Sequence, residues 1–133
     1  MKNSYKYALI AILCVALISG FVFGVIYLKN LPGKYDNFAK CLKDKGTVFY
    51  GAFWCPHCQN QKQMFGRSAK YLPYIECSTP DKKDVTNDCK ARADIIKGYP
   101  TWLFPDGTTK GGEVSMEDLA KKSGCELPTL EKK

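Results

Sequence analysis

Apolar side chains are unevenly distributed along the chain, and the longest apolar run lies close to its beginning. Residues 8–28 (ALIAILCVALISGFVFGVIYL) contain no charged side chain and only one clearly polar one, Ser19. This length matches the roughly 20 residues that a helix needs to cross the hydrocarbon core of a membrane. The run therefore predicts a helix that anchors the chain in a membrane.

A cleaved secretory signal is the alternative interpretation of this run. Such signals have an apolar region of roughly 7–15 residues, followed by small residues at the cleavage site. The run here is longer, and its last residues, Val25-Ile26-Tyr27-Leu28, are bulky. Both features favour an uncleaved anchor, in which Cys14 is simply a small apolar residue. Gly20 and Gly24 form a GxxxG pattern, so a helix–helix contact at this face is a further hypothesis.

Charges on either side of the run bear on its orientation. Two lysines precede it and two follow it: Lys2, Lys6, Lys29 and Lys34. The N-terminal tail adds an α-amino charge and has no acidic residue, so the positive-inside rule places it in the cytoplasm. We expect a single-pass protein whose later residues lie outside the cytoplasm, in a periplasm, a lumen or the extracellular space.

Shorter periodic segments follow, separated by Gly, Pro and polar residues. Their apolar spacing and end signals predict helices at residues 35–45, 55–72, 89–96 and 116–122, and strands at residues 47–53, 73–77, 101–104 and 108–114. Gly66 is expected to kink the second helix, and Ser115 with Asp118 forms a capping box. The order α-β-α-β-α-β-β-α predicts an α/β sandwich. The expected parts are a tail (1–7), the anchor (8–28), a linker (29–34), one α/β domain (35–126) and a second tail (127–133).

The net charge of +7 does not point to a nucleic-acid ligand. From Lys34 onward, 17 basic and 13 acidic residues are interspersed along the chain, with no clustered basic run that includes stacking aromatics. This pattern is typical of a mixed, solvated surface, with at most a mild attraction to anionic lipid.

Seven cysteines in 133 residues are the most informative feature of the composition. Six follow the apolar run: Cys41, Cys55, Cys58, Cys77, Cys89 and Cys125. An even number in an exported domain indicates disulfides. Structural zinc is the rival interpretation, but the chain has one CxxC pair and one histidine, so we expect no metal site.

The CxxC pair, Cys55-Pro56-His57-Cys58, comes directly after a predicted strand and opens a predicted helix. Free backbone N–H groups and the helix dipole at such a position stabilise a thiolate on Cys55. A stabilised thiolate makes the corresponding disulfide more oxidising. Cys58 would be the resolving thiol. His57 is expected to strengthen the effect on Cys55; the alternative is an exposed histidine without a role.

A second candidate for the same site is Tyr99-Pro100, which precedes the strand at 101–104. A proline in this position is a candidate for a cis peptide bond, although local sequence alone favours an ordinary trans turn. Beside the cysteines, such a loop would leave backbone groups free to pair with an extended substrate. We expect Trp54, Pro56, Tyr99 and Pro100 to form the substrate-binding surface.

Together these motifs resemble the thioredoxin superfamily. The similarity spans residues 36–125 and is greatest to the thioredoxin-like domain that is fused to, or partners, bacterial and plant vitamin K epoxide reductase homologues. The matching pieces are FAKCLKDKGTVFYGAFWCPHC, QKQMFG, YIEC, GYPTW and MEDLAKKSG; the CPHC tetrapeptide is also that of DsbA-type oxidases. The resemblance implies a three-layer α/β/α thioredoxin-like fold, a nucleophile at Cys55, a resolving thiol at Cys58 and a cis bond before Pro100.

The resemblance also bears on the remaining cysteines. It implies a structural disulfide between Cys77 and Cys89, where two free thiols or a second redox pair are the alternatives. By elimination, Cys41 and Cys125 would then pair, although six cysteines allow many other connectivities.

Two features depart from the family pattern. Typical thioredoxins carry a buried Asp six residues before the first cysteine, and Phe49 stands at that position here. The absence of this proton acceptor weakens the interpretation as a thioredoxin-style reductase. The chain also has no four-helix reductase domain, so reoxidation would need a separate membrane partner of the vitamin K epoxide reductase type.

These observations predict a membrane-anchored, extracytoplasmic dithiol oxidase. It would form disulfides in exported proteins through Cys55 and Cys58 and would need no dissociable cofactor. A reductase or isomerase that uses the same residues in the opposite direction is the main alternative. A non-catalytic, membrane-tethered chaperone or docking module is the third hypothesis.

Overall fold

The computed structural model describes residues 4–128 and divides the chain into two compact units, residues 1–31 and 32–133. The first unit consists of one helix, α1 (Ser4–Asn30). Helix α1 is longer than the predicted anchor and includes part of the predicted tail and linker. By length and composition, the helical stretch Tyr5–Asn30 is long and apolar enough to cross a membrane. Residues 1–3, with Lys2, and 129–133 lie outside the described part of the chain, and so do those portions of the two predicted tails.

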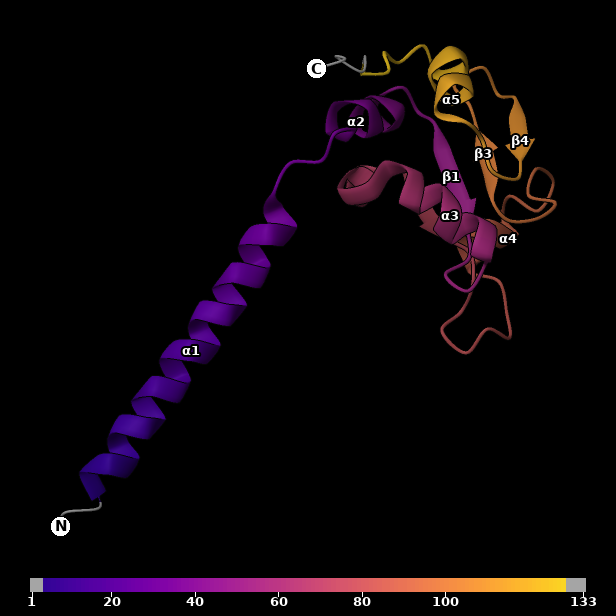
Figure 1. Ribbon diagram of the computed structural model, residues 1–133. Helices are drawn as coiled ribbons and strands as arrows, with labels where there is room; N and C mark the ends of the chain where they lie inside the picture. The colour runs from indigo at the N-terminus through magenta and orange to yellow at the C-terminus, as the bar shows by residue number, and fades with distance from the viewer. Residues whose placement is uncertain (1–3, 129–133) are drawn as a thin grey trace. The chain divides into compact units, whose positions relative to one another are not determined.

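The second unit is built on a four-stranded sheet with the order β2-β1-β3-β4 (Figure 1). The strands are β1 (Val48–Gly51), β2 (Tyr74–Glu76), β3 (Thr101–Leu103) and β4 (Thr109–Gly111). Strand β1 pairs in parallel with β2 and antiparallel with β3, and β3 forms an antiparallel hairpin with β4. The predicted α/β class with one N-terminal apolar helix is confirmed, and every strand is shorter than predicted.

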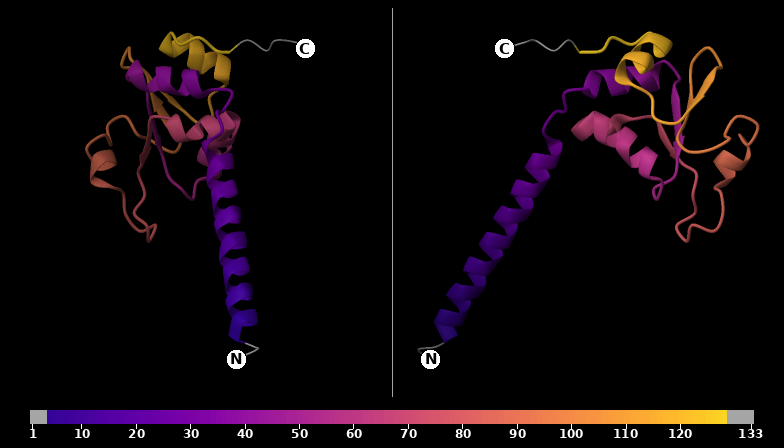
Figure 2. Two further views of the ribbon diagram at one scale, coloured as in Figure 1. Left: turned by 90° about the vertical axis from the view of Figure 1, so that its left-hand side faces the viewer. Right: turned by 45° about the vertical axis from the view of Figure 1, so that its right-hand side comes forward.

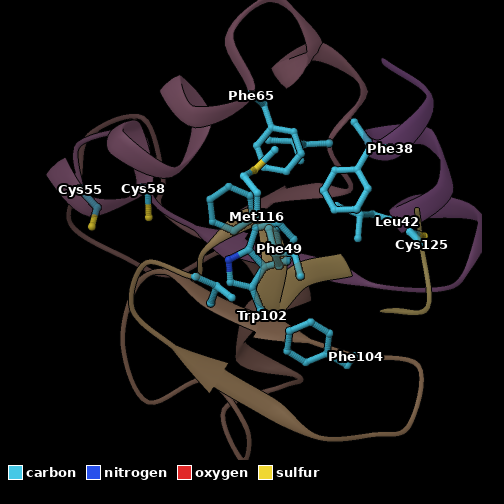
Figure 3. Close-up of a cluster of buried hydrophobic side chains, with 14 of the residues drawn as sticks. Phe38, Leu42, Phe49, Cys55, Cys58, Phe65, Trp102, Phe104, Met116 and Cys125 are labelled. Atoms are coloured by element: carbon cyan, nitrogen blue, oxygen red, sulfur yellow. The ribbon is translucent and has the colours of Figure 1, made fainter. Parts of the chain in front are cut away.

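Helices cover one face of this sheet, as the two further views show (Figure 2). They are α2 (Asp36–Asp44), α3 (Pro56–Phe65), the 3₁₀ helix η1 (Gly66–Tyr71) and α5 (Met116–Ser123). Between them and the sheet lies the main apolar core, in which Phe49 stacks on Trp102 at 4.6 Å and Phe38 stacks on Phe65 at 5.9 Å between ring centroids (Figure 3). The buried cysteines of the CxxC motif lie at one edge of this core.

The other face of the sheet is covered by the segment that contains α4 (Asn87–Lys90). A smaller apolar cluster forms there around Tyr50, Cys77 and Cys89. The predicted helix at 89–96 is wrong beyond Lys90. After that residue the backbone forms separate turns, such as the one closed by the bond from Ile95 N–H to the Arg92 carbonyl at 3.0 Å. Ile95 and Ile96 still pack against the cluster, so tertiary packing orders the segment without a continuous helix.

Two other local predictions need correction. The helix predicted over 55–72 ends at Phe65, because Gly66 has a φ of +54°, and a 3₁₀ helix follows. Ser115 does cap α5 by accepting a hydrogen bond from the Asp118 N–H at 3.1 Å. The Asp118 carboxylate, however, accepts from Lys110 Nζ at 2.6 Å, so it is engaged with β4.

Candidate functional site

Cys55 and Cys58 lie at the start of α3, and both are free thiols. Cys55 is the N-cap residue, with extended backbone angles, and its carbonyl accepts the first helical hydrogen bond from Gln59 N at 3.1 Å. Pro56 follows in the first turn, where its missing N–H leaves no helical bond unmade. The two cysteines are three positions apart, so both face the same side of the helix, but Cys55 is 6% exposed and Cys58 is fully buried.

The loop before β3 lies against Cys55. The Tyr99–Pro100 peptide bond is cis. The Cys55 thiol donates to the Tyr99 carbonyl oxygen at 3.5 Å, across 44 residues of sequence. Two bonds fix the loop: Thr101 Oγ1 donates to the Gly98 carbonyl at 2.7 Å, and Gly112 N donates to the Pro100 carbonyl at 2.8 Å. The structure thus brings together the two motifs that the sequence singled out.

An aromatic rim borders this contact. Trp54 is 47% exposed, and its indole N–H donates to Ser78 Oγ at 2.8 Å. Its ring meets the Tyr99 ring edge-on, with centroids 6.3 Å apart. Trp54 and Tyr99, with Ser78 and Val85, line a shallow groove beside the Cys77–Cys89 bridge.

His57 does not pair with a cysteine. Its Nδ1 lies 2.7 Å from Oε1 of Glu113, in the segment between β4 and α5. Asn60 Nδ2 donates to the same oxygen at 3.1 Å. Hydrogen bonds from His57 and Asn60 lower the pKa of Glu113 below its ordinary value. That His57 stabilises the Cys55 thiolate stays a prediction. The imidazole is held by the Glu113 carboxylate, a contact that the sequence did not predict.

Cys58 has surroundings unlike those of Cys55. Burial raises the pKa of the Cys58 thiol to about 12, and the neighbouring Cys55 acts in the same direction. Lys62, one turn further along α3, is half-buried, and burial lowers its pKa. Burial, together with a hydrogen bond to Glu76, raises the pKa of Tyr74. Sequence reasoning missed all three neighbours, although the i, i+4 spacing of Cys58 and Lys62 was a usable signal.

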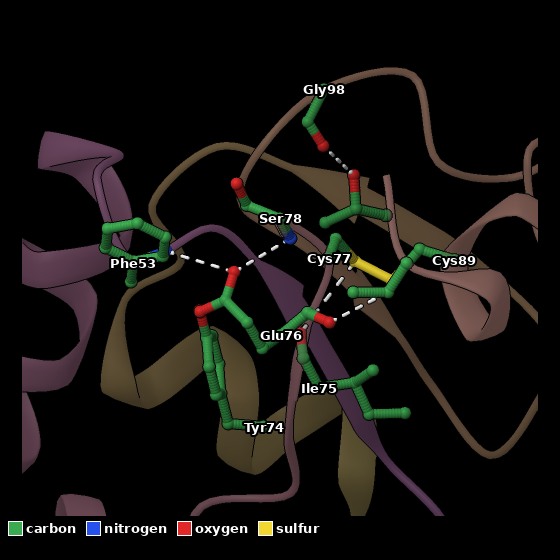
Figure 4. Close-up of a disulfide and its surroundings, with 10 residues drawn as sticks. Phe53, Tyr74, Ile75, Glu76, Cys77, Ser78, Cys89 and Gly98 are labelled. Atoms are coloured by element: carbon green, nitrogen blue, oxygen red, sulfur yellow. Dashed lines mark hydrogen bonds between the residues drawn. A yellow bond between two sulfur atoms is a disulfide. The ribbon is translucent and has the colours of Figure 1, made fainter. Parts of the chain in front are cut away.

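The other four cysteines of the domain form two disulfides. Cys41 pairs with Cys125, which links α2 to the segment that follows α5, across 84 residues. Cys77 pairs with Cys89 across 12 residues and closes the polar segment 78–88 beside the groove (Figure 4). Cys14 is a free thiol on α1. Within residues 4–128, no group of three or more His, Cys, Asp or Glu side chains is placed to hold a metal ion.

Comparison with known proteins identifies relatives of this chain. No protein-family model matches the chain. Over 91 residues, which are 67% of this chain, the sequence is 46% identical to the thiol-disulfide oxidoreductase LTO1 of Arabidopsis thaliana. The chain spans about a quarter of the length of that relative, since the match covers 24% of it. The chain is therefore similar, over most of its own length, to part of a protein named for thiol–disulfide exchange.

Proposed function

We propose that this chain is a thiol–disulfide oxidoreductase in which Cys55 exchanges with substrate and Cys58 resolves. The observation that carries the proposal is the contact between Cys55 Sγ and the Tyr99 carbonyl oxygen at 3.5 Å, at the start of α3 and beside an exposed aromatic rim. The 46% identity to part of a protein named for this activity supports it. The order of helices and strands and the resemblance in sequence further support a thioredoxin-like fold.

The exchange reaction follows from the difference between the two thiols. In the oxidised protein, a substrate thiolate attacks Cys55 Sγ, because Cys58 is fully buried. The Cys55–Cys58 bond breaks, a substrate–Cys55 disulfide forms, and Cys58 leaves with an electron pair. A second substrate thiolate then attacks the substrate sulfur of this mixed disulfide and releases Cys55. Two electrons have passed from the substrate to the cysteine pair, and the substrate carries a new disulfide.

Substrate is held, in this proposal, along Trp54, Pro56, Tyr99 and Pro100. Exposed backbone groups of the loop before β3 pair with an extended chain, and the aromatic rim packs against side chains next to the reacting cysteine. The His57–Glu113 pair lies at the start of the same helix and adds a charged flank to the site.

The proposed cellular role is the oxidation of exported proteins. Helix α1 would anchor the protein with its N-terminus in the cytoplasm, and the thioredoxin-like domain would lie outside the cytoplasm. A membrane-bound, quinone-linked thiol oxidase of the vitamin K epoxide reductase type would reoxidise Cys55 and Cys58. No dissociable cofactor is required, because the cysteine pair itself carries the electrons.

The deciding experiment is the reduction potential of Cys55–Cys58 in the full chain, measured in detergent against glutathione buffers. A value near the roughly −120 mV of strong oxidants supports oxidation, whereas a value near about −180 mV, typical of isomerases, or about −270 mV, typical of reducing thioredoxins, would favour the alternatives. Cys55→Ser should abolish oxidation of a dithiol peptide, and Cys14→Ser is the matched control that should leave it unchanged. Peptide oxidation that persists in Cys55→Ser would refute the assignment of the nucleophile.

A further inference from the structure

Opening the Cys55–Cys58 disulfide leaves a negative charge on a buried sulfur. The departing sulfur is Cys58 Sγ, which is fully buried and has a pKa raised to about 12 by that burial. A thiolate that is this basic leaves slowly, because leaving ability in thiol exchange falls as the pKa of the leaving thiol rises. The reaction therefore needs a proton close to Cys58. If the protein has the proposed function, a group beside Cys58 must supply this proton.

Lys62 is the cation that the fold brings to this sulfur. It lies four residues after Cys58 on α3, so the two side chains occupy the same face of the helix one turn apart. Its ammonium lies 3.3 Å from the centroid of the Tyr74 ring on β2. The edge of that ring and Cys58 Sγ converge on Gly51, where a Cβ, if one were added, would lie 2.8 Å from Tyr74 Cε2 and 2.9 Å from Cys58 Sγ. Lys62 and Cys58 thus both border the Tyr74 ring.

Tyr74 and Glu76, the other polar groups near Lys62, already have hydrogen-bond partners. The Tyr74 hydroxyl donates to Glu76 Oε2 at 2.7 Å. Glu76 Oε1 accepts from the N–H groups of Ser78 at 2.9 Å and Phe53 at 3.2 Å (Figure 4). The phenol proton is thus held by Glu76, and the carboxylate acts as an acceptor for three donors. A negative carboxylate fixed in this way attracts the ammonium of Lys62 and keeps it near the sulfur.

We propose that Lys62 donates its ammonium proton to Cys58 when the disulfide opens. The substrate thiolate forms a bond to Cys55 Sγ, the Cys55–Cys58 bond breaks, and its electron pair goes to Cys58 Sγ. That sulfur takes a proton from Lys62 and becomes a thiol, and Lys62 becomes a neutral amine. Because Lys62 is only half-buried, solvent can return the proton. In the reverse reaction, the neutral amine takes the proton from Cys58 as its sulfur attacks a mixed disulfide.

The charges around Lys62 support this role. Burial lowers the pKa of Lys62, and the negative charges of Glu76 and Cys58 oppose that effect. An ammonium with a lowered pKa gives up its proton more readily than an ordinary lysine, and efficient proton donors have pKa values near the working pH. Arginine at this position would keep the positive charge but could not transfer the proton, because it stays protonated at all relevant pH values.

The test measures how fast dithiothreitol reduces the oxidised full chain in detergent, from pH 6 to pH 10. Stopped-flow tryptophan fluorescence or acid quenching follows the loss of the disulfide, and each rate is divided by the concentration of dithiothreitol thiolate. Lys62→Met should lower this normalised rate by on the order of 100-fold, the lower end of the range for general acid catalysis. The wild-type rate should decline at high pH as Lys62 loses its proton, whereas Lys62→Met and Lys62→Arg should show no such decline.

Lys121→Met is the matched control, since Lys121 is an exposed lysine in the last turn of α5. Its rate and its pH profile should equal those of the wild type. Glu76→Gln provides a second test: loss of the carboxylate should move the decline to lower pH, because Glu76 stabilises the ammonium.

Three outcomes would overturn the inference: a Lys62→Met profile equal to that of the wild type, a high-pH decline that persists in Lys62→Arg, or a decline that does not move in Glu76→Gln. The reduction potential keeps this failure separate from failure of the proposed function. If wild-type Cys55–Cys58 exchanges with glutathione and dithiothreitol but Lys62→Met is equally fast, only the role of Lys62 falls. If the wild-type pair does not exchange, the proposed function falls with it.

Discussion

Gln61 is a polar side chain inside the apolar core, and its removal tests how the candidate site is held in place. The side chain is fully buried between α3 and the segment that precedes α5. Its Nε2 donates to the Val114 carbonyl at 3.0 Å, and its Oε1 accepts from Val114 N at 2.7 Å. Oε1 also accepts a longer bond of 3.4 Å from the Trp102 indole N–H. Gln61 therefore pairs with Val114 as a neighbouring β-strand would.

Gln61→Leu keeps the volume of the side chain similar but removes the three bonds to Val114 and Trp102, together with a weak bond of 3.4 Å from Nε2 to Met64 Sδ. Val114 is buried, so its N–H and carbonyl would be left without partners and without water. An unsatisfied buried donor or acceptor costs about 1–3 kcal/mol. With two such groups and a weak third, we expect the free energy of unfolding to fall by about 2–5 kcal/mol. Glu113, adjacent to Val114, should also lose its fixed position opposite His57.

Urea unfolding of the full chain in detergent, followed by tryptophan fluorescence, measures this loss. Both tryptophans lie in the domain, at Trp54 and Trp102. Gln63→Leu, an exposed position on the same helix, is the matched control and should change stability by less than about 0.5 kcal/mol. A loss below about 1 kcal/mol in Gln61→Leu would show that its bonds to Val114 are readily replaced, and would refute this account.

Two further predictions concern titration. In the reduced protein near neutral pH, brief treatment with iodoacetamide should label Cys55 well before Cys58, because Cys58 is fully buried and its pKa is raised to about 12; peptide mapping that finds equal or reversed labelling would contradict this. Hydrogen bonds from His57 and Asn60 lower the pKa of Glu113 in the folded state. They therefore stabilise the fold at any pH above the ordinary pKa of a Glu side chain, and this stabilisation is lost as the pH falls through the lowered pKa of Glu113. The difference in melting temperature between the wild type and Glu113→Gln should therefore shrink on acidification, and a difference that stays constant or grows would argue against the pairing.

The sequence predicted the order of the helices and strands because each element has a local signal. Ser115 marked the start of α5, whereas Gly66, predicted only to kink a helix that continues to residue 72, is the point at which α3 ends. It also paired the right motifs at the site, since the CxxC segment and Tyr99-Pro100 do meet in the structure. These successes rest on signals contained within a few neighbouring residues or on the resemblance to a family.

Contacts that join distant residues could not be predicted in this way. Glu113 lies 56 residues from His57, and its segment has no pattern that assigns it a partner. The helix predicted over 89–96 had suitable spacing, but Cys89 is tied to Cys77 and the following residues close turns against the second apolar cluster. In that segment, packing and the disulfide determine the backbone conformation, and they override the helical spacing of the apolar residues.

Cys55 and Cys58 differ in burial because they occupy different positions at the start of α3 and because Cys58 packs against Gly51. Cys55 precedes the helix, so its backbone is extended and its sulfur reaches the loop at Tyr99. Cys58 lies inside the first turn, so its sulfur points toward the end of β1. Gly51 leaves room for it there, because any side chain at that position would lie within 3.0 Å of both Cys58 Sγ and the Tyr74 ring. The absence of a side chain on the strand thus allows Cys58 to be fully buried and leaves Cys55, at 6% exposed, as the more accessible thiol.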